Sequence, residues 1–207
     1  MIPAAEALTR LRAGNRRFVE SIGAGEPIAG RLPLLTLPQE QEPIAIVLGC
    51  SDSRVPAELV FDQSLGDLFV IRVAGNIVAP SQVGSIEFAA SRFHTRLVVV
   101  LGHSQCGVVT ATLEELRQPS ANRSRNLRSI VDRVRPSVEA LLGTELSKDP
   151  EALIRQAVRA NVAVSVSHLR HGSEVLEDLI EHHGLAVIGA EYSIETGVVE
   201  FFDNLES

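Results

Sequence analysis

The sequence predicts an α/β fold: a mostly parallel four-stranded sheet flanked by helices, with a C-terminal added strand and an N-terminal helical arm. Two observations lead to this prediction. Four short runs rich in Val, Ile and Leu do not alternate with polar residues, which is typical of strands covered on both faces of a parallel sheet. Helical patterns lie between these runs, and strand–helix alternation favours a parallel sheet.

The N-terminal arm begins with an amphipathic pattern. Ala4, Leu8, Leu11 and Phe18 fall at helical spacing, so their side chains share one face of a helix. The segment 23–38 is rich in Gly and Pro and predicts an extended linker. Because an apolar helix face is followed by such a linker, we expect the helix to pack on a neighbouring subunit.

The remaining elements follow in order along the chain. The four apolar runs cover 44–49, 68–73, 97–102 and 185–192, and a turn leads from the last of them to the added strand at 198–202. Helical patterns cover 81–93, 107–117, 124–142, 151–170 and 173–183. No clear boundary divides the chain. We therefore expect one domain over 1–207, with the helix and extended arm in 1–40 and the α/β core in 41–207.

Composition limits the classes of partner. Of 207 residues, 45% are hydrophobic and 22% charged, the balance of an ordinary soluble globular protein. The net charge of −7 argues against binding to nucleic acid or to an anionic membrane. No apolar run approaches the roughly 18 residues of a membrane span, and the N-terminus lacks the pattern of a secretory signal. We expect a cytoplasmic location, with neither a nucleic acid nor a membrane as partner.

Two strand ends carry similar chemistry. The segments VLGCSDS (47–53) and VLGHSQC (100–106) both place metal-binding residue types after an apolar strand. Cys50 and Asp52 are two residues apart, so they point to the same side of an extended segment. His103 and Cys106 are three apart, which suits a tight turn or the first turn of a helix. Because open α/β sheets bind ligands at the carboxyl ends of their strands, these four residues predict one metal site.

The residue types in this site favour zinc. Two thiolates, an imidazole and a carboxylate suit the tetrahedral coordination of that ion. A disulfide between Cys50 and Cys106 is the weaker interpretation for a leaderless chain with only these two cysteines.

Arg54 leaves two arrangements open. It follows Asp52 by two residues, so its guanidinium can hold the carboxylate charged and oriented. Zinc then has three protein ligands and one open position, as in catalytic sites. If Asp52 binds the metal instead, the site is closed.

The motif CSDSR (50–54) followed by GHSQCG (102–107) resembles the signature pair of the β-class carbonic anhydrases. The resemblance extends over nearly the whole chain. It implies one zinc per chain, bound by Cys50, His103 and Cys106, with Asp52 and Arg54 as the catalytic dyad. The reaction that it implies is the reversible hydration of carbon dioxide to bicarbonate and a proton, by attack of zinc-bound hydroxide.

The same resemblance implies a substrate pocket and an assembly. Gln41 matches a glutamine that contacts substrate in one branch of the family. Phe69 and Phe88 match aromatic positions of the carbon dioxide pocket, although tyrosine is common at the second of them. Phe88 lacks the tyrosine hydroxyl, so the resemblance leaves it the role of lining the pocket, including a pocket of a neighbouring subunit. The resemblance also implies a homodimer or a dimer of dimers.

Two alternatives remain at this point. One is a hydrolase on the same scaffold that acts on another small linear molecule, such as carbon disulfide, and only its access channel distinguishes it. The other is a non-catalytic zinc protein in which Asp52 closes the site. A protein of this second kind does not hydrate carbon dioxide at any pH.

Overall fold

The computed structural model describes residues 2–25, 41–119 and 124–205. Most of the extended arm expected at 23–38 lies outside these residues. The N-terminal helix is α1 (Ala4–Gly23). None of the helices in the described ranges is long and apolar enough to cross a membrane.

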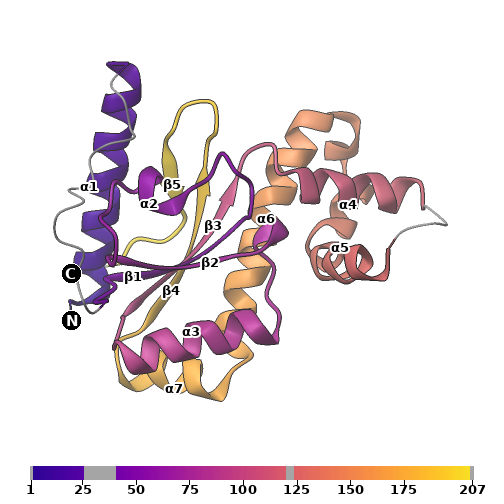
Figure 1. Ribbon diagram of the computed structural model, residues 1–207. Helices are drawn as coiled ribbons and strands as arrows, with labels where there is room; N and C mark the ends of the chain where they lie inside the picture. Colours follow the sequence, from indigo (N-terminus) through magenta and orange to yellow (C-terminus); the bar gives the residue numbers. More distant parts are fainter. Residues whose placement is uncertain (1, 26–40, 120–123, 206–207) are drawn as a thin grey trace.

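The sheet has five strands in the order β2-β1-β3-β4-β5 (Figure 1). The first four strands are parallel, and β5 runs antiparallel to β4, so the predicted fold class is confirmed. Every residue of the central strands β1 and β3 is buried, which explains why their sequences do not alternate. The strands are β1 (Ala45–Gly49), β2 (Leu68–Arg72), β3 (Leu97–His103), β4 (Ala186–Tyr192) and β5 (Val199–Phe201).

Helices cover both faces of the sheet. On one face, α1 packs through Leu8, Leu11 and Phe18 against Val47 and Val99 of the central strands. The apolar face of α1 is therefore buried within its own chain, and packing of this helix on a neighbouring subunit stays a prediction. The other face is covered by α3 (Pro80–Arg92), α6 (Pro150–His171) and α7 (Glu174–His182).

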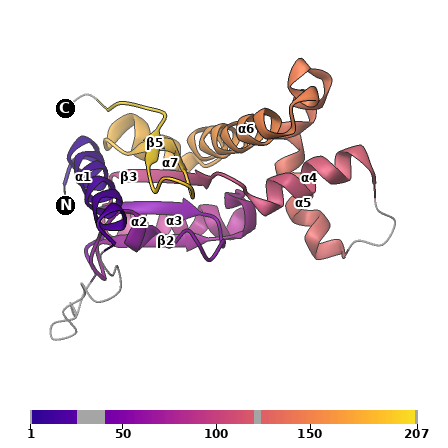
Figure 2. The same cartoon turned by 90° about the horizontal axis from the view of Figure 1, so that it is seen from above.

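A third group of helices lies beyond the carboxyl ends of the strands (Figure 2). It contains α4 (Gly107–Arg117) and α5 (Arg125–Val138), followed by the 3-10 turns η2 (Glu139–Gly143) and η3 (Glu145–Lys148). The single helix predicted over 124–142 thus ends at Val138. These elements and α6 form a separate apolar core that includes Cys50 and Cys106.

Two short elements follow the first two strands. The helix α2 (Ala57–Val60) follows β1 and packs in the same core as α1, and the 3-10 turn η1 (Ala74–Asn76) follows β2 and lies beside α4 and α5. Neither was predicted, because three or four residues are too short to show a helical period.

Candidate metal centre

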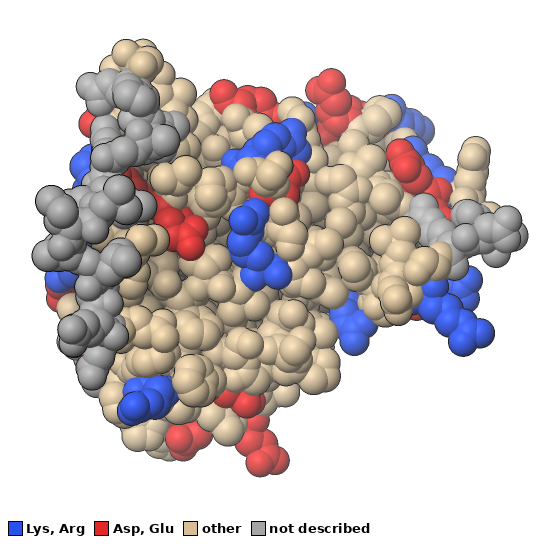
Figure 3. Space-filling view, viewed as in Figure 1, with Lys and Arg blue, Asp and Glu red and all other residues tan. Residues whose placement is uncertain are grey.

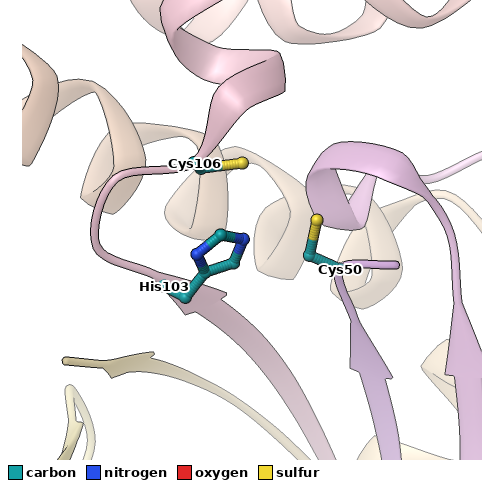
Figure 4. Close-up of side chains that lie close together, drawn as sticks. All are labelled: Cys50, His103 and Cys106. Atoms are coloured by element: carbon teal, nitrogen blue, oxygen red, sulfur yellow. The ribbon is translucent and has the colours of Figure 1, made fainter. Parts of the chain in front are cut away.

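Three side chains meet where the central strands end. Cys50 directly follows β1, His103 is the last residue of β3, and Cys106 is the residue just before α4. Their side chains point into one space between the strand ends and α4 (Figure 4). The ligand atoms lie within 4.8 Å of one another, and all three residues are buried. The predicted grouping of these three residues is therefore present.

The imidazole of His103 is arranged as a metal ligand. Its Nδ1 lies 2.8 Å from the carbonyl oxygen of Ser104, so a proton on Nδ1 is donated to that oxygen. The other nitrogen, Nε2, is buried and has no hydrogen-bond partner among the described residues. A buried, unpaired lone pair beside two sulfurs fits a cation, and the set of two thiolates and one imidazole suits zinc.

The two cysteines are unbonded and differ in acidity. The pKa of Cys50 lies well below its usual range because the Cys106 thiol donates to its sulfur, the imidazole of His103 lies beside it, and the backbone N–H of Gly75 also donates to it. The Gly75 nitrogen is 3.3 Å from that sulfur. The pKa of Cys106 is raised because its thiol proton is held by Cys50 and because burial disfavours a second thiolate. A cation between the two sulfurs removes this repulsion and lets both ligate as thiolates.

Asp52 borders the centre and is held by Arg54. The guanidinium Nε lies 2.9 Å from Oδ1 and Nη2 lies 2.7 Å from Oδ2, a two-point contact. This contact holds the pKa of Asp52 below its usual range, so the carboxylate is charged. Oδ2 lies 3.9 Å from Nε2 of His103. This is the arrangement with three protein ligands, and a ligating Asp52 stays a prediction.

Arg72, at the end of β2, supports the same loop and was not singled out from the sequence. Its Nε donates to the carbonyl of Cys50 at 3.1 Å, and its Nη2 donates to the carbonyl of Asp52 at 2.6 Å. The backbone of the first half of the CSDSR motif, on both sides of Ser51, is thereby fixed. The sequence offers only a cationic residue at the end of an apolar strand, a pattern that does not by itself distinguish a functional residue.

Phe69 and Phe88 lie at the other end of the sheet from the candidate metal ligands of the same chain. Phe69 is opposite Ile46 in the sheet register, four residues before Cys50, which is about 13 Å along a strand. Its ring packs against Phe88 and Phe93, with centroids 6.3 and 6.2 Å away. Phe88 is 53% exposed. These rings form an aromatic patch (Phe69, Phe88 and Phe93) near the amino ends of the strands.

Gln41 also lies at this far end. It is exposed and precedes β1, whereas Cys50 follows that strand. Gln41 and Phe93 line a hollow of about 640 Å³. The predicted metal ligands and the Asp52–Arg54 pair therefore come together within one chain, but Gln41 and the two predicted aromatic residues do not join them.

Comparison with known proteins identifies the family. A family model described as carbonic anhydrase matches residues 45–199. A carbonic anhydrase of Mycolicibacterium smegmatis is 38% identical, over 94% of this chain and 91% of its own. A β-carbonic anhydrase of Aspergillus fumigatus is 28% identical and has a TM-score of 0.71, covering 94% of this chain and 90% of its own. The chain belongs to the β-carbonic anhydrase family.

Membership in this family makes the chain an enzyme, a carbonic anhydrase. All three candidate zinc ligands and the Asp52–Arg54 pair fall inside the family match, whereas Gln41 lies before it. The fold is also shared with one of two tetrameric β-carbonic anhydrases of Sordaria macrospora, with a TM-score of 0.70, 23% identity and coverage of 92% of this chain and 93% of that one.

Proposed function

We propose that this chain catalyses the zinc-dependent, reversible hydration of carbon dioxide to bicarbonate and a proton. The observation that carries the proposal is the open arrangement of the centre. Three buried ligands converge on one point, and a fourth candidate, Asp52, is turned toward Arg54 at its border. A zinc site with three protein ligands keeps a position for a reactant.

Each residue then has a distinct task. Zinc, when bound, supplies the Lewis acidity that makes a water molecule nucleophilic. Asp52 accepts a hydrogen bond from the attacking water and so directs the oxygen lone pair of that water toward the carbon atom of carbon dioxide. Arg54 keeps Asp52 ionised and oriented, and it competes with the metal for the carboxylate.

The substrate side of the site is proposed to come from a partner subunit. The aromatic patch and Gln41 lie too far from the zinc ligands of their own chain, but a second copy can bring them to those ligands. Below the cationic side chains at the centre of the face that carries β2 and α3 lies a tract of uncharged side chains (Figure 3). This surface and the exposed ring of Phe88 support a homodimer, or a dimer of dimers, built on this side.

The alternatives are less well supported. In a non-catalytic zinc protein Asp52 closes the site, whereas here its carboxylate is bound at two points by Arg54. Nothing in the geometry favours carbon disulfide as substrate. The two unbonded cysteines are consistent with a reducing compartment, so we propose a cytoplasmic location.

The test combines metal analysis with a stopped-flow hydration assay. We expect one zinc per chain and carbon dioxide hydration in the native protein. Cys106→Ser should lose both zinc and activity because one of three ligands is removed. Native protein stripped with a chelator and reloaded with zinc is the control, and it should recover activity.

Three results would contradict the proposal. A protein that hydrates carbon dioxide without bound zinc would show that zinc is not needed for the reaction. A fully zinc-loaded protein without hydration at any pH would indicate the non-catalytic alternative. Hydrolysis of carbon disulfide without hydration of carbon dioxide would indicate the other enzyme.

A further inference from the structure

The backbone between two of the zinc ligands is strained. His103 and Cys106 are joined by Ser104 and Gln105, and we call these four residues the ligand turn. Gln105 has a φ of 55°, in the left-handed region that non-glycine residues rarely adopt. A strained turn keeps its shape only when its surroundings hold it. The contacts that hold this turn therefore also set the separation of two ligands.

The loop between β4 and β5 supplies these contacts. The backbone N–H of Ser104 donates to the carbonyl of Tyr192 at 2.9 Å. In return, the backbone N–H of Ile194 donates to the hydroxyl of Ser104 at 2.9 Å. Residues some 90 positions apart in the sequence are thus joined beside the metal centre.

Glu195 is the central acceptor of this contact. Its Oε2 accepts hydrogen bonds from the hydroxyls of Ser104, at 2.7 Å, and Ser193, at 3.0 Å. Its Oε1 accepts from the side-chain amide of Gln105 at 2.6 Å. The carboxylate therefore binds the side chains of both residues that lie between His103 and Cys106. These bonds, that from Ser104 above all, lower the pKa of Glu195, so the acceptor is charged and the bonds are strong.

We propose that Glu195 is a positioning residue for the zinc site: it fixes the ligand turn and, through it, the imidazole of His103. The path is short. Glu195 binds the side chain of Ser104, and the carbonyl of Ser104 accepts from Nδ1 of His103. That last bond sets the ring so that Nε2 faces the two sulfurs. Outer contacts of this kind tune metal affinity by roughly 10- to 100-fold.

The inference rests on the proposed zinc site but not on the proposed reaction. Its readout is metal retention. A site that binds zinc and does not hydrate carbon dioxide still tests the role of Glu195, and so the two proposals can fail separately.

The experiment compares three variants of the full-length, zinc-loaded protein. Glu195→Ala removes the acceptor, and Glu195→Gln keeps the shape but removes the charge and one acceptor oxygen. Glu200→Ala is the matched control, since Glu200 is an exposed carboxylate near the same loop that accepts two hydrogen bonds from Arg159 instead. Zinc release to an excess of chelator is followed with time. The visible spectrum of the cobalt(II)-substituted protein reports ligand geometry.

We expect Glu195→Ala to release zinc about tenfold faster than the native protein, with a changed cobalt spectrum. Glu195→Gln should lie between the two, and Glu200→Ala should match the native protein. If Glu195→Ala releases zinc at the native rate and its cobalt(II) spectrum is unchanged, the proposal is overturned. Equal acceleration in the Glu200 control would also overturn the proposal, since it would indicate loss of general stability. If Glu195→Ala does not fold, the isosteric Glu195→Gln decides by the same two criteria.

Discussion

Arg54 holds Asp52, the fourth candidate ligand of the proposed metal centre. Its guanidinium matches the carboxylate of Asp52 at two points, and Oδ2 is still only 3.9 Å from Nε2 of His103. We therefore expect that rotation of Asp52 can exchange the guanidinium of Arg54 for a bound metal.

Arg54→Ala should consequently free Asp52 to bind zinc. We expect a protein with a full complement of zinc and a kcat for hydration lower by roughly 100-fold, because the carboxylate leaves its catalytic orientation. Stopped-flow kinetics and zinc analysis on the same sample check this. Arg54→Lys is the control: it keeps the charge but not the two-point geometry, and should lie between the two. An Arg54→Ala protein with native activity would remove the dyad from the mechanism.

The charge of the ligand set predicts how activity depends on pH. Two thiolates bring zinc and its protein ligands to a net charge near zero, whereas three neutral histidines leave it at +2. A less positive centre acidifies water less, so the controlling pKa should lie above the value of about 7 found at three-histidine sites. We expect hydration to be slow near neutral pH and to rise into the alkaline range. A flat profile of kcat against pH would contradict the charge argument.

The candidate metal ligands could be predicted from the sequence, and the side chains that hold them in place could not. Cys50, His103 and Cys106 are marked by residue type and by matching positions after two strands. Arg72 and Glu195 act on backbone carbonyls and polar side chains of segments far away in the chain. Arginine and glutamate are common on surfaces, so no local pattern distinguishes these two.

At the scale of elements, glycines let α6 approach the sheet. A Cβ on Gly102 would lie 2.5 Å from a methyl group of Val162, and one on Gly189 would lie 2.9 Å from the same side chain. This close contact places the neighbouring Asn161 where its amide donates to the carbonyl of Gly75 at 2.9 Å. The N–H of Gly75 in turn binds the Cys50 sulfur. The position of α6 against the sheet is thus connected to the metal centre through the hydrogen bonds of Asn161 and Gly75.

Gly102→Ala should lower the free energy of unfolding by about 1–3 kcal/mol, the usual cost of overpacking a core. Gly84→Ala is the matched control, because Gly84 lies in α3 and a methyl group added there would meet nothing within 4 Å. It should raise the free energy of unfolding by about 0.5–1 kcal/mol, since alanine favours a helix. Urea denaturation of both zinc-loaded variants at one protein concentration checks the contrast. Equal effects would mean that the approach of α6 does not depend on Gly102.

The regular elements followed from hydrophobic patterning because the central strands are buried on both faces and each long helix on one. All five strands were predicted to within two residues at either end. The patterning did not specify which surface each apolar face meets. Amphipathicity shows that α1 buries one side, but the same pattern serves a sheet of the same chain or a second copy.

At the scale of the whole molecule, the parallel sheet separates two functional groups. The candidate zinc ligands lie at and just beyond the carboxyl ends of β1 and β3, and the aromatic patch lies near the amino ends. Residue spacing could not reveal this, because Gln41 is only nine residues from Cys50 in sequence, yet a full strand lies between them. Since α1 buries its apolar face in its own chain, assembly is expected to depend mainly on the aromatic patch.

Phe88→Asp should therefore weaken the dimer. A charge placed on an exposed ring of the proposed interface should raise the dimer dissociation constant by at least about tenfold, while folding of the chain is kept. Sedimentation velocity across a concentration series checks this. Leu127→Asp on α5 is the control, as it alters an apolar residue of similar exposure (43% against 53%) at the opposite end of the molecule. Unchanged assembly in Phe88→Asp, or equal loss in both, would place the interface elsewhere.

The separation of the candidate zinc ligands from the aromatic patch has a consequence for complementation between mutant alleles. If each site takes its metal from one chain and its aromatic wall from the other, a chain without Cys106 still offers an intact wall. A chain in which Phe88 is truncated to Ala still offers an intact metal centre. Mixed in one dimer, these two defective chains form one complete site and one doubly damaged site. Two inactive alleles in one cell should then restore a measurable share of activity that neither provides alone.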